Sequence, residues 1–360
     1  MGDKFSNKEV DLSNKKFPLV NLLIYFFISF IVILGIIVLI LLNNPTKLIE
    51  TCGDSTFYET CSLSKPYFCE DGFLISDSVK CGCPSNLDKM ESSCDSEYFI
   101  DPREIILNYT FNGEDNFLVF TYYGGVVDYL TSLSRSIYYG EGELPKRADF
   151  KLMKIENELQ KDLLMPLVVS IQNLAPYSKD DQARIAVSLV QNIPYLEPES
   201  VSVFGGKFNL RVSRYPYQTI YDSAGSCEGK SELLTFLLKE IGYGVSLFYY
   251  PVENHEAVGI ACPVENSFKD TKYCFIETTM PSPISYSEGR YLGPLGSNKL
   301  ASNPEIILIN EGISLGENLG EYKDAAALTK IINQIDRKGK INYFQKNKFD
   351  KLREKYSLLY

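Results

Sequence analysis

The sequence predicts an α+β fold in which helices pack on an antiparallel sheet. Leucine and isoleucine recur at helical spacing between residues 227 and 241. Three strand-like runs follow this helix, at 245–250, 255–261 and 273–278. A loop of about ten residues joins the second run to the third, which permits them to be antiparallel neighbours. We therefore expect one helix to lie against a sheet of at least three strands.

An uncharged segment near the N-terminus predicts a membrane anchor. Residues 1–17 are polar, and residues 18–42 then carry no charge over a length that exceeds the roughly 20 residues needed to span a bilayer. No small-x-small cleavage site follows, so we expect the helix to be retained. Lys15 and Lys16 adjoin its start, whereas only Lys47 lies close to its end. This asymmetry predicts a single-pass cell-membrane protein with a cytoplasmic tail, an extracytoplasmic body and lipid as a partner.

Six of the nine cysteines lie in a stretch that we expect to be a separate module, at 43–98. They are Cys52, Cys61, Cys69, Cys81, Cys83 and Cys94. Their spacing has no paired C-x-x-C and no histidine lies among them, which argues against a zinc ribbon. An even, dense set after an export signal predicts three disulfides, and the sequence leaves all 15 pairings open.

The remaining chain predicts a body at 99–290 and a C-terminal extension at 291–360. In the body, the runs ILNYTF and NFLVFTY predict strands, and 148–173 predicts one helix. Ser178 and Asp181 are typical of a helix start, and Pro194 ends that helix. Beyond these, we expect a loop at 281–300 that borders a cleft, a strand at 305–310, and helices at 324–334 and 349–359.

Composition excludes two classes of partner. The net charge of −10 argues against nucleic acid, because phosphate binding needs a basic face. Neither G-x-x-x-x-G-K-[ST] nor G-x-G-x-x-G occurs, so no nucleotide is expected, and no cofactor is implied. A metal site is also not predicted, since Cys227, His255 and Glu277 would need to converge without help from a second histidine.

Cys227 has the surroundings of a nucleophile. Gly225 and Ser226 predict a tight turn, and Gly242 is typical of a helix end, so Cys227 stands at or just before the helix N-terminus. Unpaired backbone N–H groups and the helix dipole at that position favour a thiolate, and they can also hold an oxyanion. The alternative is an inert cysteine that packs as a small hydrophobic side chain.

The strand-like runs supply the remaining groups of a thiol-nucleophile site. His255 is the only histidine in the chain, and Glu277 lies on the third run, within reach of a neighbouring strand. His255, Ala257 and Gly259 share a strand face, so we expect the small residues to leave space for a substrate. A thiol, an imidazole and a carboxylate are the parts of such a site.

Four segments resemble the transglutaminase-like superfamily of papain-like thiol enzymes. They are DDQARIAVSLVQNIPY, RYPYQTIYDSAGSCEGKSELLTFLLKEIGYGV, NHEAVGI and YCFIETT, within residues 178–285. The resemblance implies a papain-like core with Cys227 as nucleophile, His255 as base and acid, and Glu277 as the group that orients the imidazole. It also offers Gln191 as a donor to the oxyanion, the alternative being an ordinary polar residue at a helix end. Two positions depart from the family pattern: Glu277 stands where Asp is usual, and Ser226 where many members carry Asp.

The resemblance implies a cysteine protease, amidase or acyltransferase that attacks peptide or glutamine-type amides. The acyl group is then released to water, which is hydrolysis, or to an amine, which is cross-linking. We favour hydrolysis, because transfer to an amine needs a site that excludes water and the sequence shows no such site. A protein or peptide is the expected substrate. The alternative function is a cell-surface binding protein in which this body is an inactive scaffold.

Cys262 and Cys274 remain outside the predicted chemistry. They lie on strand faces opposite to those of His255 and Glu277. If the two cysteines were directly opposite each other, Gly259 would face Glu277, too far from His255 unless a bulge intervened. The sequence therefore leaves open whether they form a disulfide.

Overall fold

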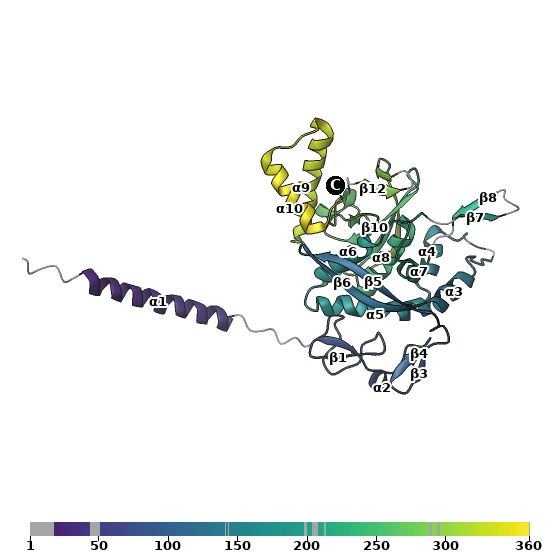
Figure 1. The fold of residues 1–360 in the computed structure, drawn as a ribbon, viewed down its shortest axis with the longest axis horizontal. Helices are drawn as coiled ribbons and strands as arrows, with labels where there is room; N and C mark the ends of the chain where they lie inside the picture. Colours follow the sequence, from purple (N-terminus) through teal and green to yellow (C-terminus); the bar gives the residue numbers. More distant parts are fainter. Residues whose placement is uncertain are drawn as a thin grey trace, which may run out of the picture. The chain divides into compact units, whose positions relative to one another are not determined.

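The computed structural model describes residues 18–43, 51–140, 142, 144–197, 200–203, 208–211, 214–287, 290–293 and 296–359 (Figure 1). The chain divides into two units, Met1–Ile49 and Glu50–Tyr360, and each is described by itself. The tail predicted at 1–17 lies outside the described residues.

The described part of the first unit is one helix, α1 (Pro18–Asn43), over the segment predicted to be helical. The side chains from 24 to 36 are all exposed. Across the described part of the chain, no helix is long and apolar enough to cross a membrane. The membrane anchor, its orientation and its lipid partner therefore stay predictions.

A module with three disulfides opens the second unit, as predicted. Its elements are β1 (Tyr67–Glu70), β2 (Phe73–Ser76), α2 (Ser78–Cys81), β3 (Asp88–Met90) and β4 (Ser93–Asp95). The pairs are Cys52–Cys69, Cys61–Cys81 and Cys83–Cys94. The Asn173 side chain exchanges two hydrogen bonds of 2.9 Å with the backbone of Leu74. These bonds fix the module to the helical part of the body.

The centre of the second unit is a four-stranded antiparallel sheet in the order β11–β10–β9–β14. The strands are β9 (Val245–Tyr250), β10 (His255–Ala261), β11 (Tyr273–Ile276) and β14 (Glu305–Asn310). Three have the predicted bounds, while β11 ends two residues before the predicted 278, so Glu277 follows the strand. Val258 and Ile260 belong to the main core with the α8 leucines. On the other face, Ala257 packs in a separate aromatic cluster with Phe248 and Phe275. Side chains on both faces of β10 are thus buried.

The packing on this second face contradicts the expectation that the small residues of β10 leave space for a substrate. A Cβ on Gly259 would lie 2.3 Å from Ser246 Oγ and 2.8 Å from the Phe248 ring. The small residues of β10 therefore make room for aromatic side chains, and not for a substrate.

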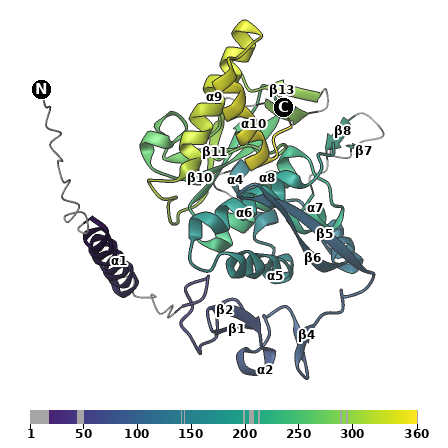
Figure 2. The same cartoon turned by 60° about the vertical axis from the view of Figure 1, so that its left-hand side comes forward.

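Helices lie beside the sheet in both ribbon views (Figures 1 and 2). They are α3 (Gly124–Ser132), α4 (Arg147–Ile155), α5 (Glu158–Leu174), α6 (Lys179–Asn192), α7 (Pro216–Tyr221), α8 (Cys227–Ile241), α9 (Gly320–Lys338) and α10 (Tyr343–Tyr356). α8 lies against β10, and α6 lies against α8. The single helix predicted at 148–173 is two helices, because the Asn157 side chain accepts from Gln160 N and starts α5 anew.

Antiparallel hairpins and short helical turns complete the unit. They are β5 (Pro102–Phe111) with β6 (Glu114–Tyr123), β7 (Ser200–Val203) with β8 (Phe208–Arg211), β12 (Arg290–Gly293) with β13 (Gly296–Lys299), and the 3-10 turns η1 (Val264–Asn266) and η2 (Phe268–Asp270). The segment 281–300, predicted to be a loop, therefore contains a hairpin. Its position beside the candidate site is described below.

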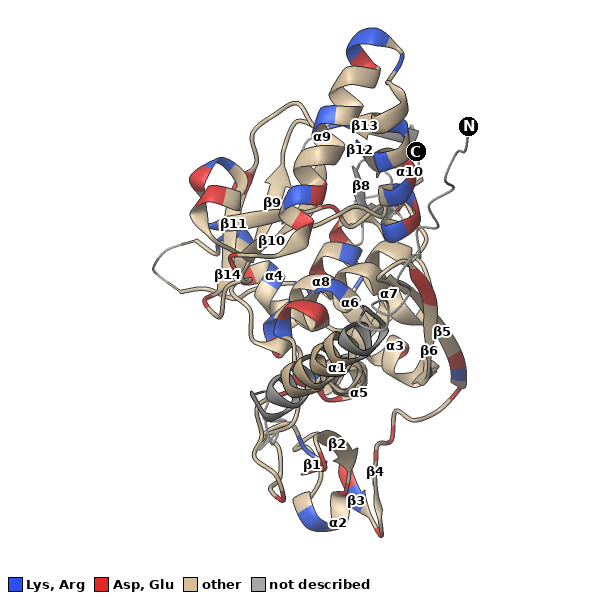
Figure 3. Ribbon diagram, turned by 90° about the vertical axis from the view of Figure 1, so that its left-hand side faces the viewer, with Lys and Arg blue, Asp and Glu red and all other residues tan. Residues whose placement is uncertain are grey.

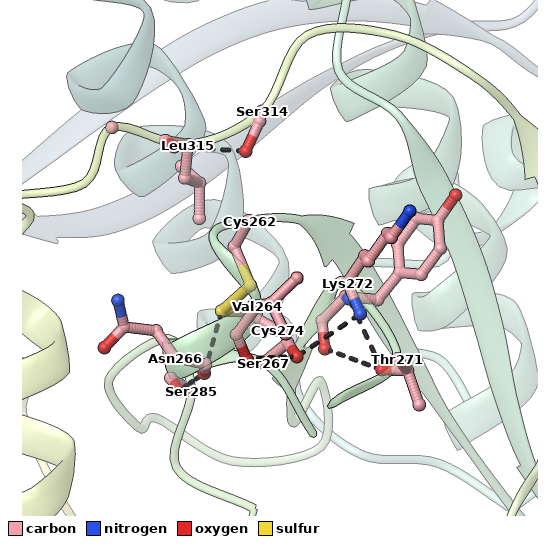
Figure 4. The surroundings of a disulfide bond; sticks show 12 residues. Cys262, Val264, Asn266, Ser267, Thr271, Lys272, Cys274, Ser285, Ser314 and Leu315 are labelled. Carbon is pink, nitrogen blue, oxygen red and sulfur yellow. Dashed lines mark hydrogen bonds between the residues drawn. A yellow bond between two sulfur atoms is a disulfide. The ribbon is translucent and has the colours of Figure 1, made fainter. Parts of the chain in front are cut away.

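Cys262 and Cys274 form a disulfide, with their Cα atoms 5.7 Å apart (Figure 4). The two residues are not directly opposite. Ile260 pairs with Cys274, while Cys262 N donates to Lys272 O. Relative to the register assumed from the sequence, this offset of two residues moves β11, and with it Glu277, toward His255. The Cys262–Cys274 disulfide and the His255–Glu277 contact therefore both form without a bulge between β10 and β11.

Replacing Cys262 and Cys274 together by alanine should lower the free energy of unfolding by about 3 kcal/mol, the loop entropy expected for a closure of this length. Chemical denaturation of the Glu50–Tyr360 unit measures this. The matched control is Cys83→Ala with Cys94→Ala, since the sequence separation is 11 there and 12 here. An unchanged denaturation midpoint in the Cys262/Cys274 variant would show that the bridge does not stabilise the sheet.

Candidate active site

Cys227 is the first residue of α8, as the sequence predicted. The Ser226 side chain caps this helix by accepting from Gly229 N at 3.3 Å. Gly225 is required before it, because a Cβ there would lie 2.7 Å from the Thr219 side chain. All nine cysteines are described, and Cys227 is the one without a disulfide. The capped turn therefore presents a single free, partly exposed thiol at a helix N-terminus.

His255 and Glu277 lie close together, at the start of β10 and just after β11. His255 Nε2 is 3.0 Å from Glu277 Oε2, and both side chains are nearly inaccessible, at 1% and 2% exposure. Because Nε2 is directed at the carboxylate, Nδ1 is the ring nitrogen left to interact with Cys227. The contact between His255 and Glu277 that the sequence predicted is therefore present in the structure.

Three further donors hold the Glu277 carboxylate. Its Oε1 accepts from Thr278 N at 3.0 Å, Thr279 N at 2.8 Å and Thr279 Oγ1 at 2.7 Å. Burial raises the pKa of Glu277, but the charge and hydrogen bond of His255 and the Thr279 donors outweigh it and lower the pKa. Glu277 is thus held as a carboxylate in a fixed orientation.

The imidazole is held in its charged form. Burial disfavours the charge on His255, but the Glu277 carboxylate and hydrogen bonds with Cys227 and Glu277 outweigh it and raise the pKa to about 10. A protonated imidazole beside a thiol is the arrangement of an ion-paired thiolate.

His255 permits a direct test of this arrangement, because it is the only histidine in the chain and its NMR signals need no assignment. We expect its titration midpoint to lie well above 6.5, near 10. Glu277→Gln should lower the midpoint more than Cys227→Ala, since the Glu277 charge is the largest favourable influence. A midpoint at or below 6.5 in the native protein would contradict the ion pair.

A cavity of about 490 Å³ opens on Cys227 and His255, whereas Glu277 does not line it. It is lined by Arg147, Tyr195, Ser226, Cys227, Glu228, Tyr249, Val252, Glu253, Asn254, His255, Glu256, Tyr291, Leu292, Gly293 and Asn298. A larger cavity of about 800 Å³ lies between the cysteine-rich module and α5, and none of the three predicted site residues lines it. We therefore assign the chemistry to the smaller cavity.

Two residues of the site were not found from the sequence. The Tyr291 ring on β12 lies over the His255 ring, with centroids 4.1 Å apart. Thr279 Oγ1 accepts from Leu292 N at 2.8 Å while it donates to Glu277, so one hydroxyl connects β12 to the buried carboxylate. The doublet of threonines after Glu277 is a signal for Thr279, whereas nothing in the sequence marks Tyr291.

Gln191 has a different environment from the one that its predicted role needs. Its Nε2 donates to Glu277 O at 2.8 Å and Ser282 O at 3.1 Å. Gln191 does not line the cavity. Its amide thus positions the segment that carries Glu277, and the oxyanion role stays a prediction from the sequence.

Buried charges fix the N-terminal end of α8 to its surroundings. Lys151 Nζ lies 2.9 Å from both Glu232 and Glu256, and Lys154 Nζ lies 2.6 Å from Glu232. Glu228, next to Cys227, also pairs with Lys151. These contacts join α4, α8 and β10, so removal of one partner would leave an uncompensated buried charge.

A further buried lysine lies behind the nucleophile. Lys230 Nζ donates to Ile193 O at 2.5 Å, just beyond the end of α6. Burial lowers the pKa of Lys230 to about 7, although Glu277 and Cys227 act in the opposite direction. Lys230 therefore links the first turn of α8 to the end of α6.

Among the described residues, no group of three or more His, Cys, Asp or Glu side chains is arranged to hold a metal ion.

The comparisons with known proteins add little to the geometry of the site. Neither a family model nor a curated protein matches the chain. Calcium-bound LapG of Legionella pneumophila matches 49% of this chain and 98% of its own, with 15% identity and a TM-score of 0.25. A likeness at that score supports no conclusion, so the α+β fold and the site rest on the structure described above.

Proposed function

We propose that the protein is a transglutaminase-like thiol enzyme that acts on peptide or glutamine-type amide bonds. The observation that carries this proposal is one arrangement: a lone free thiol at a capped helix N-terminus, beside an imidazole whose other nitrogen binds a buried carboxylate. Nucleophile, base and orienting group in contact are the signature of covalent catalysis.

In this mechanism the Cys227 thiolate attacks the amide carbonyl carbon and forms a tetrahedral oxyanion. Protonated His255 then gives its Nδ1 proton to the leaving amine, and the C–N bond breaks. Glu277 keeps the ring oriented and stabilises its positive charge. Water attacks the thioester with His255 as base, and a carboxylic acid is released with the thiol restored.

The backbone at the start of α8 is the proposed oxyanion donor. The first N–H groups of a helix have no intrahelical acceptor, and the Ser226 side chain already serves Gly229. The N–H groups of Cys227 and Glu228 remain, beside the cavity that both residues line. They are placed to bind the oxyanion in the role first expected of Gln191.

We propose hydrolysis in preference to cross-linking because the Cys227 side chain is partly exposed, so water can reach its acyl form. The second candidate is an inactive scaffold that binds a partner at the cell surface. In that case Cys227 would react as an ordinary thiol, whatever residue stands at position 255.

The test is incubation of the Glu50–Tyr360 unit with unfolded protein substrates, with and without a fluorescent primary amine. Hydrolysis predicts cleaved peptides or conversion of glutamine to glutamate, while cross-linking predicts covalent incorporation of the amine. Cys227→Ser should abolish either product, and mass spectrometry should show an acyl adduct on Cys227. No product, together with a thiol that reacts no faster than an ordinary cysteine, would favour the scaffold.

The anchor at 18–42 and the extracytoplasmic position of the body belong to the same proposal. Its support is the sequence: an uncharged run of that length, lysines on its N-terminal side, and disulfides in the body. Protease added outside intact cells should degrade the body. Full protection of the body would overturn this orientation.

A further inference from the structure

The helical hairpin of α9 and α10 ends in a tip that the core does not use. α9 ends at Lys338 before left-handed Gly339, and Asn342 caps the start of α10. Leu328, Leu352 and Tyr356 are buried between the two helices and the body. The residues from 337 to 344 lie beyond this packed region, and all but one of them are exposed. The hairpin projects at the edge of the unit in all three ribbon views (Figures 1, 2 and 3).

The tip exposes two aromatic side chains next to each other. Tyr343 is 77% exposed and Phe344 is 81% exposed, and their ring centroids are 5.8 Å apart. They occupy the first turn of α10, where neither contributes to the buried cluster of the hairpin. The two adjacent rings thus form a small exposed apolar patch, which is a candidate contact surface.

The tip and the helix α10 that follows it are strongly basic in an acidic protein. Residues 337–355 carry eight basic and two acidic side chains, whereas the whole chain has a net charge of −10. Lys348 and Lys355 pair with Asp324, and Lys346 pairs with Asp350. Arg337, Lys338 and Lys340 are exposed, and no described acidic residue forms an ion pair with them. Figure 3 shows basic residues along α9 and α10 and at their turn.

A helix end alone does not account for both features. Basic residues at the end of α9 favour the helix dipole, which explains Arg337 and Lys338. That effect gives no reason for Lys340 beyond the helix, nor for an exposed phenylalanine in the next one. The coincidence of unpaired basic residues with exposed rings needs a partner that is both anionic and apolar.

We propose that this tip docks on an anionic lipid surface. Tyr343 and Phe344 would enter the boundary between headgroups and acyl chains, while Arg337, Lys338 and Lys340 contact lipid phosphates. A flat bilayer meets only the projecting tip, whereas an extended polyanion would also run along an acidic body. The inference depends on neither the enzymatic proposal nor the membrane segment at 18–42.

Fluorescence tests the contact directly, because the chain contains no tryptophan. Phe344→Trp in the Glu50–Tyr360 unit, which lacks α1 and contains all four disulfides, places one reporter at the tip. We expect its emission to shift to shorter wavelength with vesicles of phosphatidylglycerol and phosphatidylcholine, and to stay unchanged with phosphatidylcholine alone. The matched control is Tyr138→Trp, at an aromatic residue 93% exposed elsewhere, which should not shift with either vesicle.

Charge variants measure the electrostatic part by vesicle sedimentation. Lys338→Gln with Lys340→Gln should weaken binding to anionic vesicles about 30-fold, since each basic residue near the surface strengthens that binding about fivefold. Lys323→Gln with Lys330→Gln removes the same charge from exposed positions earlier on α9 and should change binding less than threefold, roughly the scatter of such contributions. Equal losses in the two variants, equal binding to neutral vesicles, or binding to heparin but not to vesicles would each overturn the proposal.

Discussion

At about pH 6, iodoacetamide should alkylate Cys227 about 100-fold faster in the native protein than in a His255→Gln variant. An ordinary thiol with a pKa of about 8.5 is only about 0.3% ionised there. A protonated imidazole favours the thiolate form of a neighbouring cysteine, for a gain of at most about 300-fold, and the lower nucleophilicity of such a paired thiolate reduces this to about 100-fold. Glutamine retains a donor toward Glu277, so the variant changes the charge beside the thiol more than the packing.

The pH dependence distinguishes this ion pair from a merely accessible thiol. His255, with its pKa raised to about 10, stays protonated across the neutral range, so the native rate should be nearly flat from about pH 6 to about pH 9. In the variant the rate should rise about tenfold per pH unit toward the ordinary thiol pKa. Because Cys227 is the only cysteine outside a disulfide, total incorporated label measures it directly. Equal rates at every pH would remove the enzymatic proposal and leave the scaffold.

The elements that carry this chemistry were predictable because their signals are local. Leucine spacing, the Gly225–Ser226 turn and Gly242 define α8, and the structure places Gly242 in the left-handed conformation that a helix-ending glycine adopts. Strand periodicity likewise placed His255 at the start of β10. The three disulfides of the module followed from the density of cysteines, whereas their pairing depends on how the chain folds between them.

The features that were missed depend on contacts between distant segments. Tyr291 reaches His255 only because β12 pairs with β13 and is tied to Thr279, and a Pro-, Ser- and Gly-rich segment gives no periodic signal of that hairpin. The space predicted beside Ala257 and Gly259 is filled by Phe248 and Phe275, since small residues mark a close approach without showing what approaches. The Gln191 amide likewise donates to Ser282 O, and only the fold brings that distant residue beside it.

Glu277→Gln should lower the turnover of the proposed enzyme by about 10⁴-fold, the loss expected when a triad carboxylate is replaced by its amide. The reason lies in the hydrogen bonds that surround this side chain. Thr278 N, Thr279 N and Thr279 Oγ1 all donate to Oε1, so the glutamine oxygen must occupy that position. Its NH₂ group then faces His255 Nε2 and can only donate to it.

That reversal changes the tautomer of His255. A ring that accepts at Nε2 carries its proton on Nδ1 when neutral, and Nδ1 is the atom that must accept the proton of Cys227. The variant should therefore lose the ion pair as well as the turnover, and its alkylation rate at about pH 6 should approach that of His255→Gln.

Two controls separate this effect from a general loss of structure. Glu253→Gln changes a carboxylate that lines the same cavity but bonds to Ala301 and Ser302, and it should change turnover less than about threefold, because it touches no member of the triad. Glu277→Asp keeps the charge and acceptor-only chemistry but shortens the reach, so it should retain more activity than Glu277→Gln. If Glu277→Gln kept native turnover, Glu277 would be a structural anchor for the segment after β11, and the charge on His255 would have to be stabilised by Cys227 alone.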